Sequence, residues 1–287
     1  MSPLATRHQA LREATRRLLS AEVEDAEHDA LRLLAHASGC APLEIASQAT
    51  APLEPDVAAR FEALVGERAR RVPLQHIVGT VGFHAIELEV SRRVLVPRAE
   101  TELLVDAVLD WLKVRALPAP RVLDLGTGSG AIAIAIARAR LEARVVATDA
   151  SLDALAVAGR NAARNGVAAR IALLAGCWFQ PLRRLDAFDV VVSNPPYVTT
   201  AEIGALAPEV REHDPRLALD GGPDGLAPYR AICAEAPLRL RSPGLLALEV
   251  AGTRAAEVAA LARDAGFETT CIRADYAGWP RVVLATI

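Results

Sequence analysis

The stretch RVLDLGTGSGAIAIAIARAR, residues 121–140, decides the fold because it joins a buried strand to a helix through a glycine-rich turn. Residues 121–126 form a short apolar run that ends on glycine, which is typical of a β-strand. The run after the turn alternates between alanine and isoleucine, and alternation alone would favour another strand. Its alanine content and its place directly after a glycine turn favour a helix instead. The stretch therefore predicts a strand, a turn and a helix in succession.

The same order of strand and helix continues downstream. A strand at 144–149 precedes a helix at 151–166, with Ser151 as a suitable N-cap and Gly166 as terminator. Five further runs complete the strands: RIALLAG (170–176), DVVVSN (189–194), GLLALEV (244–250), FETTCIRAD (267–275) and RVVLATI (281–287). This alternation predicts a doubly wound, parallel α/β sheet of seven strands. The YAGWP turn between the last two strands is too short for a parallel crossover, so they should pair antiparallel.

The chain before residue 73 carries helix patterns alone. A first helix follows from apolar residues on one face, a second spans about 25–38 and ends on Gly39, and a third starts near Pro55. The residues expected to be buried in the first and third helices are Leu11, Ala14, Leu18, Leu19, Val57, Phe61, Leu64 and Val65. Strict alternation in VGFHAIELEVSRRVLV, residues 81–96, then predicts a β-hairpin.

These patterns divide the chain into three parts. We expect a helical domain at 1–72, a linker with the hairpin at 73–96, and the α/β domain at 97–287. A helical bundle of about 70 residues is expected to be only marginally stable without a partner domain.

Composition places the chain among ordinary globular proteins. Of its 287 residues 52% are hydrophobic and 23% are charged, and the formal net charge is −3. That charge provides no basic field for nucleic acid or an anionic membrane, so neither is an expected partner. The N-terminal stretch lacks the apolar core of a signal peptide, and no long uncharged apolar run could span a bilayer. We therefore expect a cytoplasmic protein.

Cysteine and histidine give no sign of a metal centre. The cysteines at 40, 177, 233 and 271 are scattered without a CxxC pair, which is typical of reduced thiols. The six histidines lack HExxH or comparable ligand spacing. Neither a disulfide framework nor a metal site is expected.

The glycine turn itself, DLGTGSG at 124–130, has the features of a ligand loop. Glycines there let backbone N–H groups approach a ligand closely, with a helix N-terminus behind them. Asp149 ends the following strand, where a carboxylate can accept hydrogen bonds from both hydroxyls of a ribose. Each feature also has a structural explanation, a plain turn for the glycines and a helix N-cap for Asp149. Together they favour an adenosine-containing ligand, either NAD or S-adenosylmethionine (SAM).

A second corner, in DVVVSNPPYVTT at 189–200, distinguishes these ligands. Proline ends strands because it has no N–H, but that explains neither Asn194 nor Tyr197. In open α/β sheets ligands bind beyond the carboxyl ends of strands, where the strand order reverses, and this would make Asn194 a neighbour of the glycine loop. A nicotinamide enzyme usually needs an acid or a base there, and Asn-Pro-Pro-Tyr offers neither.

The corner suits a planar amino group instead. The side-chain oxygen of Asn194 and the carbonyl of Pro195 can accept both N–H bonds of an NH₂ on a conjugated carbon, and Tyr197 can pack on its flat face. Such a nitrogen is a poor nucleophile because its lone pair is delocalised, and these hydrogen bonds raise its electron density. Catalysis would then rest on positioning and electrostatics, with a methyl sulfonium as the driving force.

DLGTGSG followed by SNPPY resembles the class I SAM-dependent amino-methyltransferases, and DNA adenine and cytosine methyltransferases share the NPPY corner. Four longer segments are more specific: PLQHIVGTVGFHAIELEV, VLVPRAETELLV, PEVREHDPRLALDGGPDGLAPYR and DYAGWPRVVLA. In order and spacing they resemble the release-factor glutamine methyltransferase family (PrmC/HemK), over nearly the whole chain. The resemblance implies a Rossmann-like methyltransferase domain with a seven-stranded, mostly parallel sheet whose last strand is antiparallel, and a small N-terminal helical bundle joined by a β-hairpin.

The resemblance also implies a reaction, N5-methylation of the glutamine in the Gly-Gly-Gln motif of bacterial class 1 peptide-chain release factors, with SAM as methyl donor. The helical bundle would help to dock the release factor, and the PRAET loop (97–101) would close near the site. The implied SAM-binding residues are Gly126, Thr127, Gly128, Ser129, Gly130, Asp149, Trp178 and Asn194. The implied glutamine-binding residues are Asn194, Pro195, Pro196 and Tyr197, of which Asn194, Pro195 and Tyr197 would be catalytic.

The chain departs from the family at Cys177, where an aspartate is usual, and a thiol cannot accept from the adenine amine in the same way. Trp178 would stack near the adenine, or would be a partly buried core aromatic. Two other functions stay open: a nucleic-acid adenine methyltransferase, which predicts a basic groove, and a non-catalytic SAM-binding partner of release factors. A monomer is expected, because the bundle can dock on its own catalytic domain.

Overall fold

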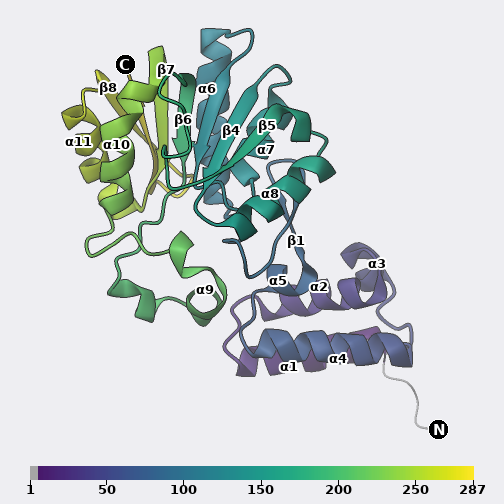
Figure 1. Cartoon of the computed structure of the whole chain (residues 1–287). Helices are drawn as coiled ribbons and strands as arrows, with labels where there is room; N and C mark the ends of the chain where they lie inside the picture. Colours follow the sequence, from purple (N-terminus) through teal and green to yellow (C-terminus); the bar gives the residue numbers. More distant parts are fainter. Residues whose placement is uncertain (1–5) are drawn as a thin grey trace. The chain divides into compact units, whose positions relative to one another are not determined.

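The computed structural model describes residues 6–287, which divide into two compact units (Figure 1). The helical unit holds the described residues up to 79 together with residues 207–213. The sheet unit holds residues 80–206 and 214–287. The first five residues of the helical domain expected at 1–72 lie outside the described residues.

The helical unit is built from helices that bury one apolar face each. Its elements are α1 (Arg7–Ser20), α2 (Ala26–Ser38), α3 (Pro42–Ser47), α4 (Pro55–Ala69), α5 (Leu74–Val78) and α9 (Pro208–His213). Leu18, Leu33 and Phe61 belong to a shared core between the longer helices. Gly39 ends α2 in the left-handed conformation that was expected of it. Leu19 differs from expectation: its side chain is 59% exposed, because a second leucine beside Leu18 falls outside the buried stripe.

A partly buried network of ion pairs connects α9 to the rest of the helical unit, although α9 is far away in sequence. Arg68 Nε donates to Asp29 Oδ2 at 2.6 Å, and Arg68 Nη1 donates to Glu209 Oε1 at 3.0 Å. Arg71 adds two hydrogen bonds to the Glu209 carboxylate, at 2.6 and 2.7 Å. Burial opposes the charge of Glu209, but these hydrogen bonds outweigh it and lower its pKa to about 2. Glu209 is therefore the anchor of α9.

The sheet unit contains a small hairpin and a seven-stranded sheet. The hairpin strands are β1 (Thr80–Phe83) and β2 (Ile86–Glu89). The sheet strands are β3 (Arg121–Leu125), β4 (Arg144–Asp149), β5 (Ile171–Ala175), β6 (Phe188–Ser193), β7 (Leu240–Glu249), β8 (Thr269–Ala274) and β9 (Pro280–Thr286). Their order is β5-β4-β3-β6-β7-β9-β8, and β9 pairs antiparallel with both of its neighbours. The mostly parallel sheet with an antiparallel last strand is thereby confirmed.

Helices cover both faces of this sheet (Figure 1). One face packs against α6 (Glu100–Arg115), α7 (Ala131–Ala139) and α8 (Leu152–Arg164), the other against α10 (Ala227–Arg239) and α11 (Ala255–Asp264). Short 3₁₀ turns lie at Ala168–Arg170, Glu202–Ala205, Arg216–Ala218 and Gly252–Arg254. The alternating run after the glycine turn is a helix, α7, as predicted. It is buried almost all round, which explains why its sequence shows no polar face.

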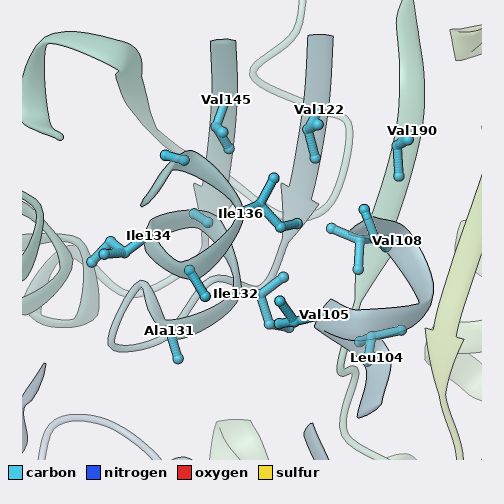
Figure 2. Packing of buried hydrophobic residues seen from close by; sticks show 14 of the residues in the cluster. Leu104, Val105, Val108, Val122, Ala131, Ile132, Ile134, Ile136, Val145 and Val190 are labelled. Atoms are coloured by element: carbon cyan, nitrogen blue, oxygen red, sulfur yellow. The ribbon is translucent and has the colours of Figure 1, made fainter. Parts of the chain in front are cut away.

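The two faces follow from strand periodicity. Val122 of β3 packs with α6 and α7, whereas the next residue, Leu123, packs with the α10 and α11 side. Figure 2 shows the first of these cores, where Val122, Val145 and Val190 of three neighbouring strands meet Ile136 of α7 and Val108 of α6. Burial of these branched side chains fixes the register, since a slip of one residue would exchange the faces.

The hairpin and the segment before it differ from the expected linker at 73–96. Residues 73–79 belong to the helical unit, because Pro73 is the N-cap of α5 and Leu74 joins the helical core. The hairpin belongs to the sheet unit, because Phe83 and Leu88 join the core around α6 and α7. Among residues 6–287 no helix is long and apolar enough to cross a membrane.

Candidate active site

The strand order reverses between β3 and β6. From β3 the chain passes to β4 on one side and returns to β6 on the other, so the loops after β3 and β6 meet at one edge of the sheet. Ser193, the last residue of β6, pairs with Leu125, the last of β3, and its hydroxyl donates to the Leu125 carbonyl at 2.7 Å. Asn194 therefore follows β6 where Gly126 follows β3, which confirms the expected reversal of the strand order.

The loop after β3, which we call the glycine loop (residues 126–130), is held by β4. Gly126 and Thr127 donate their N–H groups to the Thr148 carbonyl at 2.9 and 3.0 Å. Gly128 N–H donates to Asp149 Oδ2 at 2.8 Å, and Ser151 N–H donates to Asp149 Oδ1 at 2.8 Å. Asp149 is thus not the N-cap of α8; that role belongs to Ser151, which accepts from Ala154 N–H at 3.2 Å. Each carboxylate oxygen of Asp149 keeps acceptor capacity for a ligand.

The three positions of the loop require glycine for different reasons. All three have positive φ, which favours glycine. A Cβ on Gly128 would meet open space, whereas a Cβ on Gly130 would come within 2.9 Å of Ile134 Cδ1 and 3.2 Å of Ala158 Cβ. Gly128 thus belongs to the ligand side of the loop, and Gly130 lets α7 pack against α8.

A cavity of about 300 Å³ lies beside this loop within the sheet unit. The predicted residues that line it are Gly126, Thr127, Gly128, Ser129, Asp149, Trp178, Asn194 and Pro196. Gly130, Pro195 and Tyr197 are not among its lining residues. Pro97, Arg98 and Thr101 also line it, so the PRAET segment does border the site. The volume is that of a small-molecule site.

Cys177 and Trp178 form one wall of the cavity. The Trp178 ring lies against the loop, 3.5 Å from where a Cβ on Gly126 would be, and the Trp178 carbonyl accepts from the Thr148 hydroxyl at 2.9 Å. Trp178 also packs at the border of the core beneath α10, so it is both a cavity wall and a partly buried aromatic. Open space at Gly128, acceptors on Asp149 and a flat ring fit an adenosine-type cofactor.

The corner after β6, which we call the NPPY corner (residues 194–197), is held by side chains. Asn194 Nδ2 donates to Thr101 Oγ1, in the first turn of α6, at 3.2 Å. Pro195 is buried, and the Tyr197 ring packs at the border of the core beneath α10. Burial, and then the charge of Glu249, raises the pKa of Tyr197, so its hydroxyl stays neutral near pH 7.

The segment 219–225 supports the NPPY corner from outside the sheet. Val198 N–H donates to the Leu219 carbonyl at 3.0 Å, and Gly221 N–H donates to the Val198 carbonyl at 2.8 Å. A Cβ on Gly221 would lie 2.9 Å from the Pro196 carbonyl oxygen, and one on Gly225 would lie 2.5 Å from the Tyr197 carbonyl oxygen. Both glycines are therefore required by close backbone approach, which the cluster GGPDG could have indicated.

Two buried acidic residues near this edge of the sheet were not among the residues expected from the sequence. Burial raises the pKa of Asp124 to about 7, against hydrogen bonds from the Thr127 hydroxyl at 2.6 Å and Ala133 N–H at 3.2 Å. Burial likewise raises the pKa of Glu249, at the end of β7, to about 7. Each was visible in the sequence as a lone acid in an apolar strand, in RVLDLG and GLLALEV. The described residues hold no cluster of His, Cys, Asp or Glu suited to a metal ion.

Solved methyltransferases share the fold of the sheet unit. A methyltransferase from Pyrococcus furiosus matches with a TM-score of 0.52 at 18% identity, covering 77% of this chain and 98% of that one. The 16S rRNA methyltransferase RsmC of T. thermophilus, in complex with AdoMet and guanosine, matches with a TM-score of 0.51 at 21% identity, covering 72% and 49%. The family model of the methyltransferase small domain matches residues 100–215. The fold of the sheet unit is that of a class I methyltransferase.

The remainder of the chain narrows this class. The family model of the PrmC N-terminal domain matches residues 9–79. Release factor glutamine methyltransferases of Cereibacter sphaeroides and Moorella thermoacetica are 44% and 42% identical to this chain. The alignments cover 97% of both chains in the first case and 98% of both in the second. The chain belongs to the release factor glutamine methyltransferase family and is an enzyme.

Proposed function

We propose that this protein transfers a methyl group from SAM to the side-chain amide nitrogen (N5) of the glutamine in the Gly-Gly-Gln motif of bacterial class 1 release factors. The supporting observation is the meeting of the glycine loop and the NPPY corner at one sheet edge, beside one cavity. A cofactor held by the first would present its methyl group to an amide held by the second.

Residues of the glycine loop side would hold SAM. The Asp149 carboxylate would accept hydrogen bonds from the ribose hydroxyls, and the backbone at Gly126–Ser129 would follow the ribose and methionine part. Trp178 would stack on the adenine, with Cys177 at its edge. When bound there, SAM supplies a methyl group on a positively charged sulfur.

Residues of the NPPY corner would hold the target amide. Asn194 Oδ1 and the Pro195 carbonyl would accept its two N–H bonds, and Pro196 and Tyr197 would confine its flat face. The target nitrogen would take up the methyl group as the S–C bond breaks, and the sulfur would leave as a neutral thioether that keeps the bonding electron pair. The nitrogen, made acidic by the new methyl group, would then lose a proton to solvent. No strong base is needed, so positioning and electrostatics would carry the rate enhancement.

Incubation of the purified protein with SAM and an unmodified bacterial release factor tests this proposal. We expect mass spectrometry of the Gly-Gly-Gln peptide to find one added methyl group on the glutamine. A protein that binds SAM but leaves this glutamine unmodified would contradict the proposal. DNA and RNA adenines would then be the next substrates to test, and failure there would favour a non-catalytic SAM-binding protein.

The remaining parts of the proposal concern partners and location. We propose that the helical unit helps to dock the release factor, and that the enzyme acts as a cytoplasmic monomer without nucleic acid. A formal charge of −3 supports the last point, since phosphate binding requires a basic surface. Light scattering of the enzyme alone and with a release factor tests the monomer and the docking together. If the enzyme by itself is a dimer, the proposed monomer is contradicted. If no complex with the release factor forms, the proposed docking is contradicted.

A further inference from the structure

Glu249 ends β7 as a buried carboxyl group behind the NPPY corner. The parallel register pairs Leu248 with Ser193, so Glu249 lies level with Asn194 on the neighbouring strand. Glu249 is 4% exposed, and its Oε2 is buried without a hydrogen-bond partner. A buried, incompletely bonded carboxyl group costs stability, so its presence here indicates a task beyond packing.

Two side chains of the cavity wall interact with Glu249. Thr101 and Asn194 line the cavity, and Glu249 is not among the lining residues. Asn194 Nδ2 donates to Thr101 Oγ1 at 3.2 Å, which leaves the proton of the Thr101 hydroxyl for a second acceptor. Hydrogen bonds from Thr101 and from Asn194 both lower the pKa of Glu249, against the effect of burial. The carboxyl group therefore interacts with both members of the Asn194–Thr101 pair.

An asparagine amide has two nearly isosteric orientations, which differ by exchange of oxygen and nitrogen. The amide of Asn194 can accept from a target NH₂ only if Oδ1 faces the cavity and Nδ2 faces the protein. With the opposite orientation, Nδ2 would oppose the NH₂ of the target. Something on the protein side must therefore select one orientation.

We propose that Glu249, as a carboxylate, is the positioning residue that fixes the Asn194 amide with Nδ2 toward the protein and Oδ1 toward the cavity. A carboxylate offers acceptors alone, so it favours Nδ2 and the Thr101 hydroxyl as neighbours and repels Oδ1. A protonated carboxyl group can donate to Oδ1 and no longer discriminates. The inference rests on the proposed function, which requires an acceptor that faces the target amide.

The charge of Glu249 responds to pH near neutrality. Burial raises its pKa, while the facing groups act in both directions: Glu100 of α6 raises it, and Arg281 of β9 lowers it. The hydroxyls of Tyr197 and Tyr229 also face it, and both have a pKa raised above 10, so they do not titrate in this range. The carboxylate form therefore gains as pH rises through about 7, and methyl transfer should gain with it.

The variant Glu249→Gln tests this inference, because it keeps the shape and removes the charge. We expect kcat for release-factor methylation to fall about 10- to 100-fold, with the KM for release factor and the Kd for SAM within about twofold. The rise of kcat between pH 6 and pH 8 should be lost. Thr101→Val should lower kcat in the same direction, and Thr101→Ser, which restores the hydroxyl, should recover most of it.

Asp189→Asn is the matched control. Asp189 is also a buried carboxylate of this sheet, but it lies at the amino end of β6, where it accepts from Arg121 N–H at 2.7 Å and pairs with Arg241. The kcat and the pH profile of the Asp189→Asn variant should equal those of the unchanged enzyme. Thermal unfolding of each variant shows whether a loss of activity is a loss of fold.

A readout without catalysis separates this inference from the proposed function. In a ¹⁵N–¹H spectrum, the side-chain NH₂ signals that vanish in Asn194→Ala belong to Asn194. They should shift with pH around 7 in the unchanged protein and stay constant in Glu249→Gln. If these signals shift with pH but the protein does not methylate the release factor, the role of Glu249 is supported and the proposed function is contradicted.

Two results would overturn the inference. In the first, Glu249→Gln keeps full kcat and the original pH profile. In the second, the unfolding temperature, SAM affinity and kcat fall together while the residual activity keeps its rise with pH, which would make Glu249 a merely structural residue.

Discussion

The glycine loop and the NPPY corner lie side by side at one sheet edge, yet they are built from different atoms. Backbone N–H groups bind the glycine loop to β4, through the Thr148 carbonyl and the Asp149 carboxylate. The NPPY corner is connected to α6 through one side-chain hydrogen bond, from Asn194 to Thr101. A loop held by main-chain groups tolerates most side-chain changes, whereas the NPPY corner depends on the side-chain amide of Asn194 for one of its two proposed acceptors. The two halves should therefore fail differently under mutation.

Asn194→Ala should have the largest effect on turnover. It removes an acceptor of the target NH₂, and loss of one such polar group typically costs about 100- to 1,000-fold in kcat. The SAM Kd should change less than about threefold, because the glycine loop and Asp149 stay intact. Methylation assays and calorimetric SAM titration measure the two effects. A variant with full activity would refute the proposed mechanism.

Asp149→Ala should produce the reverse pattern. Loss of a charged acceptor for the ribose hydroxyls should weaken SAM binding about 10- to 100-fold, because hydrogen bonds to charged groups are worth about 1.5–3 kcal/mol. At saturating SAM, kcat should recover substantially. Asp153→Ala, in the first turn of α8 and paired with Arg93 at the surface, is the control and should bind SAM normally. Equal SAM affinity in the unchanged enzyme, Asp149→Ala and Asp153→Ala would show that Asp149 does not bind SAM.

Two glycines within the glycine loop should differ in what their substitution costs. Gly130→Ala should destabilise the fold by about 1–3 kcal/mol, because its Cβ would overlap with Ile134 and Ala158. Gly128→Ala meets no neighbour and should cost about 1 kcal/mol through its positive φ alone, while its methyl group enters the cavity side. Denaturant unfolding and SAM titration separate these effects. A Gly128→Ala protein less stable than Gly130→Ala would contradict this assignment.

The buried acid beneath the glycine loop should affect stability through pH. The pKa of Asp124 is about 7 in the folded protein against a reference of 3.8, so the folded state holds a proton that the unfolded state releases. The contribution of Asp124 to stability should therefore fall as pH rises from about 4 to about 7, and level off above that. Asp124→Asn should decline less over this range. Unfolding temperatures at several pH values measure the slope, and an unchanged slope would mean that Asp124 is ionised throughout.

Cys177→Asp should have the smallest effect. A carboxylate at this cavity wall would accept from the adenine amine. Because residue 177 is exposed to solvent, the added hydrogen bond should be worth only about 0.5–1.5 kcal/mol, up to about tenfold in the SAM Kd. Cys177→Ser, without a charge, is the control. Weaker binding in the aspartate variant would show that this wall does not face the adenine.

The sequence predicts the sheet unit well because each of its signals is local. Apolar runs mark the strands, and the right-handed crossover then leaves few ways to order them. The meeting of Gly126 and Asn194 follows from that order. Contacts such as Asn194 with Thr101 and Glu249 cannot be derived in this way, because they depend on side chains from three elements. The anchoring of α9 to Arg68 and Arg71 also lacks a local signal, since Glu209 looks like any exposed acid of a short helix.

Because α9 belongs to the helical unit, the protein cannot be divided into its two units by one cleavage of the chain. The chain passes between the two units at residues 79/80, 206/207 and 213/214, so no single cut separates them. A protease that nicks the chain after residue 79 leaves a helical fragment without Glu209, with the guanidinium groups of Arg68 and Arg71 deprived of their shared carboxylate. Arg68 would keep its ion pair with Asp29, but the partly buried Arg71 would lose its carboxylate partner, which is destabilising. The helical unit is therefore not an independent module that could be exchanged between enzymes by a simple gene fusion at its C-terminal border.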